Sequence, residues 1–286
     1  MIKMLKKNTL PTIGGLILPL MMSLTADAGQ GKLLATAGLV QLEGSGGGGI
    51  VPWATLAGYD SRDETSLTVF GTQVDVDDYQ LNSWGAAVSL YDRVELSVAR
   101  QDFELSQSGA EIRQNIIGIK VRLYGDVVYS PWPQVSAGIQ HKRLLDPAIA
   151  QAVGADSSDH GTDYYLAMTK VHLGAAAGYN VVWNVAGRFT KANQMGLLGY
   201  GGKHNNHQLM LEASLGVLLS KHWVVGVEYR QKPNNLALRE DDWKDVFISY
   251  VPSKALNLTL AWADLGEIAG ERNQQGLYLS FSGQLW

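Results

Sequence analysis

The histidines are the first residues to examine for chemistry, because the chain has six of them and no cysteine. Asp159 and His160 are adjacent, and an acid beside a histidine can activate water in a hydrolase. Adjacent side chains in a loop rarely converge on one substrate atom, so catalysis is the less favoured interpretation. His204 and His207 have a spacing that could hold a metal ion on a helix, but glycines precede them and no third ligand is near in the sequence. The sequence therefore predicts no enzyme, metal site or cofactor, with a barrel hydrolase as a minor alternative.

A second group of candidates carries charge on the polar face of segments whose other face is apolar. It comprises Arg188, Glu212, Glu228, Arg230, Lys120 and Arg122. The first four are expected near mid-height on three successive strands. Two interpretations stay open. The residues line a pore and form a polar constriction that selects small solutes, or they form a salt-bridge network that fills a sealed interior, where unpaired charge would be costly.

Alternation with a period of two, in segments of about ten residues, would position these charges. Leu258 and Leu260 alternate with Asn257 and Thr259, and residues 209–217 follow the same pattern. In a soluble sandwich the polar face points to water, whereas in a membrane barrel it faces the lumen. The alternation alone does not separate these two folds.

Fourteen segments have the character of a strand. They span residues 33–42, 50–60, 65–78, 82–90, 93–104, 112–124, 133–143, 163–173, 181–192, 207–219, 223–232, 243–251, 255–264 and 276–286. Short and long connections alternate between them, as in bacterial barrels whose termini are both periplasmic. The predicted fold is therefore all-β: a transmembrane antiparallel up-and-down barrel of about 14 strands. The count becomes 12 if the first hairpin, around the glycine run 46–49, folds inside.

One long connection, from Leu144 to Thr162, contains a predicted short helix. Asp146 is placed to cap its start, Pro147 fits the first turn and Gly154 ends it. The helix either covers the outer mouth of the barrel or folds into the pore as a constriction.

The N-terminus predicts export. Lysines at positions 3, 6 and 7 precede an apolar stretch that ends in Ala26-Asp27-Ala28, the order of a secretory signal peptide. We expect residues 1–28 to be a cleaved leader and residues 29–286 to form the barrel. The chain has a net charge of −4 and its remaining part has no long basic block, which argues against nucleic-acid binding. The expected partners are outer-membrane lipids, the barrel-assembly machinery and small solutes.

Several stretches are similar to a known family. They include residues 190–199, 228–236, 240–245, 47–54 and 92–97. On these stretches the chain resembles the proteobacterial family called domain of unknown function 3034, over nearly the whole length after the leader. The resemblance implies an outer-membrane protein of a Gram-negative bacterium and carries no established activity. From the residues we expect a narrow channel or transporter for small solutes, with a plugged barrel of structural or adhesive role as the alternative.

Overall fold

The computed structural model describes residues 31–238 and 240–285, so the predicted leader and the last residue lie outside the described residues. The elements are β1 (Leu39–Val40), β2 (Gly46–Gly47), β3 (Thr65–Val76), β4 (Tyr79–Leu90), β5 (Val94–Leu105), β6 (Ala110–Tyr124), β7 (Gln134–Leu144), α1 (Pro147–Ala152), β8 (His160–Ala176), β9 (Tyr179–Thr190), η2 (Asn193–Gly196), β10 (Gln208–Leu218), β11 (Trp223–Arg230), β12 (Trp243–Ser253), β13 (Leu256–Asp264) and β14 (Gln275–Leu285). Within these residues, no helix has both the length and the apolar character needed to cross a membrane.

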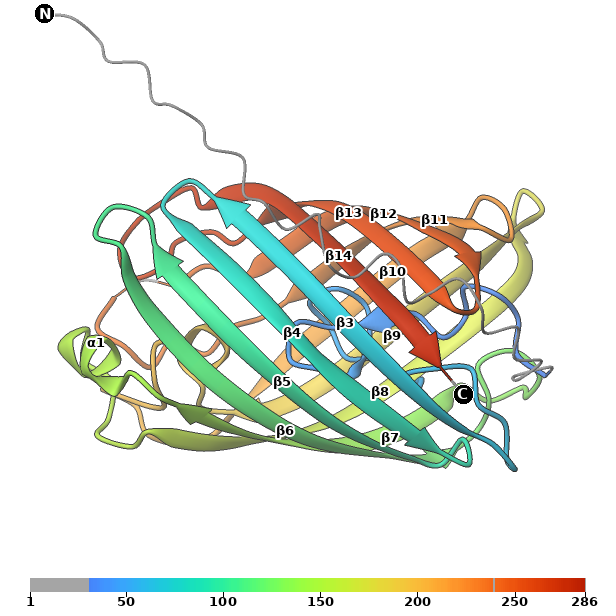
Figure 1. Cartoon of the computed structure of the whole chain (residues 1–286), viewed down its shortest axis with the longest axis horizontal. Coiled ribbons are helices and arrows are strands. Elements are labelled where there is room, and N and C mark those ends of the chain that lie inside the picture. The colour runs from blue at the N-terminus through green and yellow to red at the C-terminus, as the bar shows by residue number, and fades with distance from the viewer. Residues whose placement is uncertain (1–30, 239, 286) are drawn as a thin grey trace, which may run out of the picture.

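Strands β3 to β14 form one closed barrel in the described part of the chain (Figure 1). Every strand is antiparallel to its neighbours in sequence, and β14 pairs with β3 to close the ring. The twelve-strand alternative is therefore confirmed, because the predicted segments at residues 33–42 and 50–60 do not join the wall.

The two faces of the wall follow the predicted alternation. On β13, Leu258 and Leu260 are 41% and 47% exposed on the outside, whereas Asn257 and Thr259 are buried inside. The outward positions are thus enriched in apolar side chains, and the inward positions hold polar and small side chains together with larger apolar ones such as Phe103 and Phe247. A polar lumen inside an apolar outer surface is the pattern of a membrane barrel.

The connections differ at the two ends of the barrel. At one end, which we call the short-turn end, most turns are tight. The first wall strand, β3, begins at this end, and the last, β14, ends there. At the other, the long-loop end, the connections include residues 145–159, 191–207 and 231–242. In Figure 1 the long-loop end, with α1, is on the left.

The lumen is occupied by the chain itself. Residues 31–60, which we call the plug, run inside the barrel and include the two-stranded pairing of β1 with β2 (Figure 1). Every residue from Leu39 to Asp60 is buried. Both ends of the plug meet the turn at Asp92: Lys32 forms an ion pair with Asp92 at 2.8 Å, and the Asp92 amide donates to Asp60. The plug therefore enters and leaves the barrel at the short-turn end.

At the long-loop end, the predicted helix and the segment that folds into the lumen are different parts of the chain. The predicted helix is present as α1, but most of its residues are at least partly exposed and it stays outside the lumen. Asp146 does not cap it, and instead pairs with Arg113, whose hydrogen bond lowers the pKa of the Asp146 carboxyl. Residues 192–200, which contain η2, are all buried and fold inward instead.

Candidate functional site

Three of the predicted lumenal residues meet inside the barrel, toward the long-loop ends of their strands rather than at the expected mid-height. Arg188 on β9 pairs with Glu212 on β10 at 2.6 Å, and Arg230 on β11 pairs with the same carboxylate at 3.3 Å. All three are almost completely buried. They come from the adjacent strands β9, β10 and β11, and their side chains share the inner face because inward positions recur at every second residue along a strand. Their role as pore-lining residues stays a prediction.

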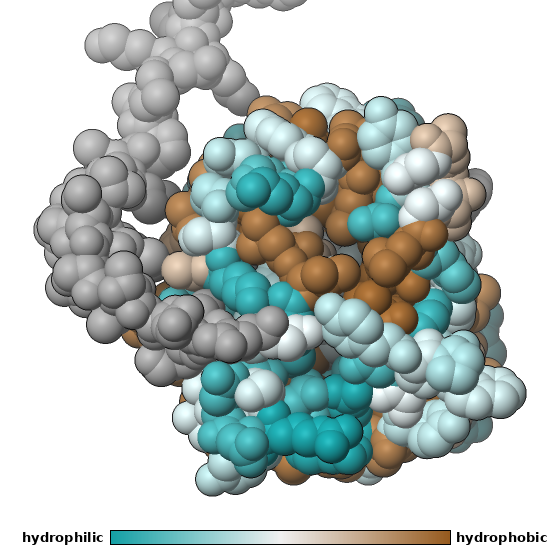
Figure 2. All heavy atoms as spheres, turned by 90° about the vertical axis from the view of Figure 1, so that its right-hand side faces the viewer, coloured by the Kyte–Doolittle hydropathy of each residue, from teal (hydrophilic) through white to brown (hydrophobic). Residues whose placement is uncertain are grey.

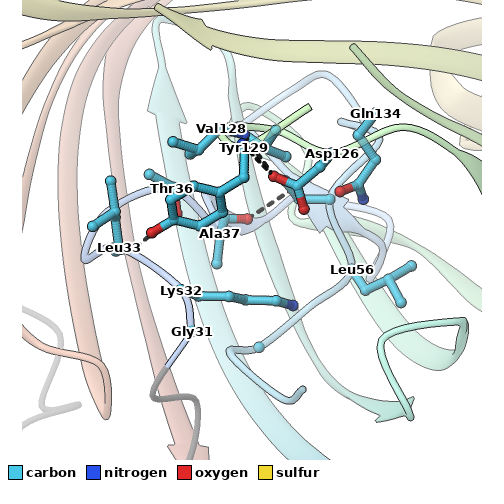
Figure 3. Close-up of a pocket in the computed structure, with 13 residues that line it drawn as sticks. Gly31, Lys32, Leu33, Thr36, Ala37, Leu56, Asp126, Val128, Tyr129 and Gln134 are labelled. Atoms are coloured by element: carbon cyan, nitrogen blue, oxygen red, sulfur yellow. Dashed lines mark hydrogen bonds between the residues drawn. The ribbon is translucent and has the colours of Figure 1, made fainter. Parts of the chain in front are cut away.

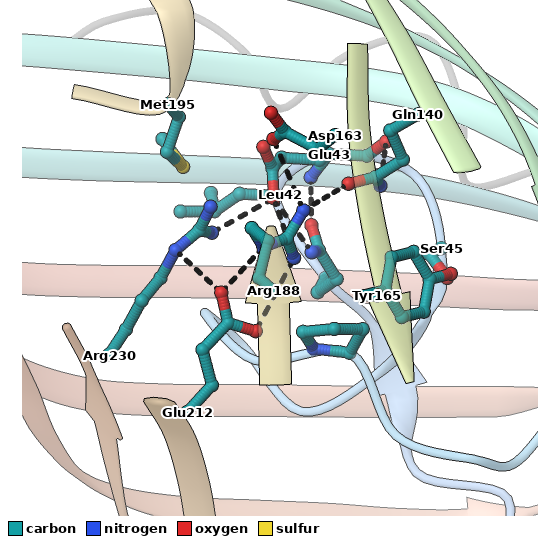
Figure 4. A network of polar contacts seen from close by, with 12 residues as sticks. Leu42, Glu43, Ser45, Gln140, Asp163, Tyr165, Arg188, Met195, Glu212 and Arg230 are labelled. Carbon is teal, nitrogen blue, oxygen red and sulfur yellow. Dashed lines mark hydrogen bonds and ion pairs between the residues drawn. The ribbon is translucent and has the colours of Figure 1, made fainter. Parts of the chain in front are cut away.

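The plug supplies a further carboxylate to this group (Figure 4). Glu43 pairs with Lys142, with Arg230 at 2.9 Å and with Arg188 at 3.4 Å. Burial alone would raise the pKa of the Glu43 carboxyl, but Arg230, Lys142 and Arg188 together hold that pKa well below its usual range. Glu43 is therefore a charged anchor that ties the plug to the wall.

Two more wall residues complete the network, and the sequence analysis did not single them out. Lys142 on β7 pairs with Asp163 on β8 at 2.6 Å, and Asp163 is also 3.4 Å from Arg188. The wall thus carries alternating charges on five neighbouring strands, from Lys142 through Asp163, Arg188, Glu212 and Arg230. Both residues lie in predicted strands, so counting inward positions along those strands would have found them. Nothing in the sequence marked Glu43.

Glu228, which we expected to join this network, lies apart from it. One of its oxygens accepts hydrogen bonds from the plug amides of Gly49 and Ile50, both at 2.8 Å. Its direct neighbour across the sheet is Asp245, another buried carboxyl. Glu228 therefore binds plug backbone rather than an arginine.

Lys120 also contacts the plug. Its ammonium group donates to the carbonyl oxygens of Gly46 and Thr55, both at 2.7 Å, and pairs with Glu95 at 3.3 Å. Glu95 in turn accepts from the amides of Gly46 and Ala57. The Lys120–Glu95 pair therefore binds the plug in two places, at Gly46 and at the returning segment from Thr55 to Ala57.

Arg122 is at the short-turn end, away from the other predicted residues. It pairs with Asp92 and with Asp126 at 3.0 Å, and so ties two turns of that end together. Figure 2 shows this end of the molecule, where side chains of both polar and apolar character cover the barrel opening outside the grey region.

A small pocket remains beside the plug at this end (Figure 3). Leu33 and Thr36 of the plug line one side, and Val128 and Tyr129 of the turn after β6 line the other. Its volume of about 40 Å³ has room for little more than water. A solute could not pass through it while the plug is in place.

The histidines singled out for chemistry lie at the long-loop end. His160 and Asp159 are 2.8 Å apart and both are well exposed, and the hydroxyl of Ser158 donates to the His160 carbonyl rather than to its ring. His207 contacts the Thr162 carbonyl, stacks on Phe189 and is not joined by His204. In residues 31–238 and 240–285, no group of three acidic, histidine or cysteine side chains could hold a metal ion.

Comparison with known protein families gives one match, which covers residues 36–282, and its description is protein of unknown function, DUF3034. The chain belongs to this family. None of the curated proteins matches the DUF3034 chain significantly.

Solved structures that the DUF3034 chain is similar to are barrels of low sequence identity. The Acinetobacter baumannii outer membrane protein Omp33 has a TM-score of 0.48 and 9% identity, over 79% of this chain and 100% of that one. The KdgM porin has a TM-score of 0.49 and 9% identity, over 77% and 99% of the two chains. The NanC porin has a TM-score of 0.49 and 8% identity, over 77% and 100%. At these values the likeness supports no statement about function.

Proposed function

We propose that this protein is an exported outer-membrane barrel that acts as a gated channel for small solutes, and that the plug is its gate. In this proposal residues 1–28 are the cleaved leader, the short-turn end faces the periplasm and the structure is the closed state. The apolar outer surface and the closed ladder support the membrane location, because a strand edge cannot be left unpaired in lipid.

The way in which the plug is attached carries the proposal. In the part of the chain that the structure describes, no backbone hydrogen bond joins the plug to a wall strand. Polar wall side chains bind the plug backbone instead: Ser83 and Gln101 donate to the Leu42 carbonyl, and Gln134 and Ser136 donate to that of Ala54. The plug can therefore leave through the short-turn end while the ladder of the wall stays intact. The wall that it leaves behind carries many polar side chains together with apolar ones such as Phe103.

A sealed barrel with a structural role is the second candidate, and one observation favours it. Leu42, Ile50 and Trp53 of the plug belong to one apolar cluster with wall residues such as Phe103 and with Leu198 of the inward-folded loop. Burial of this apolar surface stabilises the filled lumen and opposes opening.

Loosening the plug separates the two candidates. A Cβ atom on Gly46 would lie 2.6 Å from the Ala57 nitrogen and 2.9 Å from the Leu56 carbonyl carbon, both backbone atoms of the returning arm. Gly46→Val therefore forces the backbone of the plug to shift, which weakens its docking, and it changes no wall strand. We expect this variant to conduct at least tenfold more current than the wild type in a planar bilayer, at equal folded yield.

The chain offers a matched control in the same segment. A Cβ atom on Gly31 would meet nothing within 4 Å, so Gly31→Val should conduct as the wild type does. If Gly46→Val folds and carries no more current than Gly31→Val, the gate is refuted and the sealed barrel stands.

A further inference from the structure

The wall network has an unequal number of charges when the plug is left out of the count. On the wall, Lys142, Arg188 and Arg230 face only two carboxylates, Asp163 and Glu212. Glu43 of the plug is the third carboxylate and makes the numbers equal. An excess buried cation is costly, and within the directly contacting groups Glu43 compensates it in the closed state.

The geometry around Glu43 is that of a carboxylate receptor. Lys142 contacts one of its oxygens, and Arg188 and Arg230 contact the other. These three cations come from β7, β9 and β11 and converge on one carboxylate (Figure 4). Contacts of this kind between ionised groups are the stronger class of hydrogen bond.

The receptor is held in shape by contacts that do not involve the plug. Arg188 donates to Gln140 at 2.7 Å and lies over the Tyr165 ring at 5.3 Å, besides its contact with Glu212. Arg230 lies over the Trp243 ring at 5.8 Å. Since these partners are on the wall, the cations should keep their positions when the plug moves.

We propose that Lys142, Arg188 and Arg230 form a carboxylate-binding site that holds Glu43 in the closed state and a small organic monocarboxylate from solution when Glu43 is absent. The role in an open channel rests on the proposed function above. The Glu228 and Asp245 carboxyls lie next to this site, since Glu228 is two residues from Arg230, roughly 7 Å along the strand. They disfavour a second negative charge on the solute, so monocarboxylates are selected over dicarboxylates.

Chemical rescue tests the site without requiring the gate to open. Glu43→Ala removes the plug carboxylate and leaves room for acetate, which can enter while the full chain refolds from urea. Acetate should raise the unfolding midpoint of this variant, or its folded yield, in a saturable manner. At ten times its Kd, acetate multiplies the folding equilibrium constant by about tenfold. The uncharged amide acetamide should have no effect, and neither compound should affect the wild type.

A second arm uses the loosened channel. Sodium gluconate should reduce the current of Gly46→Val in a saturable way and glucose should not, and adding Lys142→Met should abolish the block. A Gly46→Val channel that conducts, with neither acetate rescue of Glu43→Ala nor gluconate block, would overturn the carboxylate site and leave the gate standing. Acetate rescue in a protein that never conducts would support the site and refute the gate.

Discussion

The barrel wall and the plug inside it are held in place by different interactions. The wall strands are joined by a continuous antiparallel ladder that closes on itself. The plug is joined to that wall through side chains: Glu43 of the plug pairs with wall cations, and Glu95, Lys120 and Glu228 of the wall bind the plug backbone. Changes in the wall should therefore alter assembly, whereas changes in the plug should alter conduction.

This difference also separates two kinds of buried charge. Glu212 compensates cations of the wall, so it supports the barrel whether or not the plug is docked. Glu228 binds plug amides and faces a second carboxyl, so its negative charge is not needed to compensate a cation. Two glutamates on neighbouring strands are thus expected to respond in opposite ways to loss of charge.

The largest effect is expected for Glu212→Gln. The change leaves Arg188 and Arg230 with too little negative charge, and removing one partner of a buried ion pair costs roughly 3–5 kcal/mol. The urea-unfolding midpoint of the refolded protein should drop accordingly.

Glu228→Gln is the matched control for that measurement. Its amide oxygen can still accept from Gly49 and Ile50, and its amide NH₂ can donate to Asp245. We expect an unfolding midpoint equal to or above that of the wild type. Equal losses in the two variants would remove the distinction between wall charge and plug charge.

A somewhat smaller effect is expected on the outer face of the wall. Leu260 is at the middle of β13 and 47% exposed, so Leu260→Arg places a charge near the centre of the proposed bilayer. This should cost about 2–4 kcal/mol and lower the yield of folded barrel in lipid vesicles. Leu219→Arg, at the rim of the short-turn end, should cost about 0–1 kcal/mol. Equal yields would contradict the assigned membrane position.

Acid should release the plug only at low pH. The lowered pKa of Glu43 means that its charge stabilises the docked plug fully above the usual glutamate pKa, about 4.3, and that this contribution is lost as the pH falls through the lowered value. Wild-type conductance should therefore stay low at pH 5 and rise only under more acidic conditions. In Glu43→Gln this acid-dependent step should be smaller. Opening of the wild type above pH 5 would contradict this role of Glu43.

The wall could be predicted from the sequence because its pattern is local. Alternation at Leu258, Leu260 and their neighbours fixes which face is apolar, and strands β3 to β14 lie close to the predicted segments. The same alternation places Arg188, Glu212 and Arg230 on the inner face of the wall, where they form ion pairs.

The plug could not be predicted in the same way, because its contacts join residues far apart in the chain. Residues 33–42 and 50–60 have strand-like composition, and only their pairing with polar wall side chains shows that they lie inside. Glu43 contacts Arg230, which is 187 positions away, and no local pattern records that distance. The segment 192–200 also folds inward through a long-range contact, because the backbone carbonyl of the buried Met195 accepts a hydrogen bond from Lys142. The predicted helix, in contrast, stays outside the lumen.

Locking the plug with a disulfide is the most direct test of the gate. The Ala54 amide lies 2.8 Å from the Thr169 hydroxyl oxygen, so cysteines at these positions are within reach of each other, and the chain has no other cysteine. In the triple variant Gly46→Val, Ala54→Cys, Thr169→Cys, we expect no single-channel current after oxidation. Reduction should restore the current of Gly46→Val. Equal currents in the oxidised and reduced protein would contradict the account, because solutes would then pass without movement of the plug.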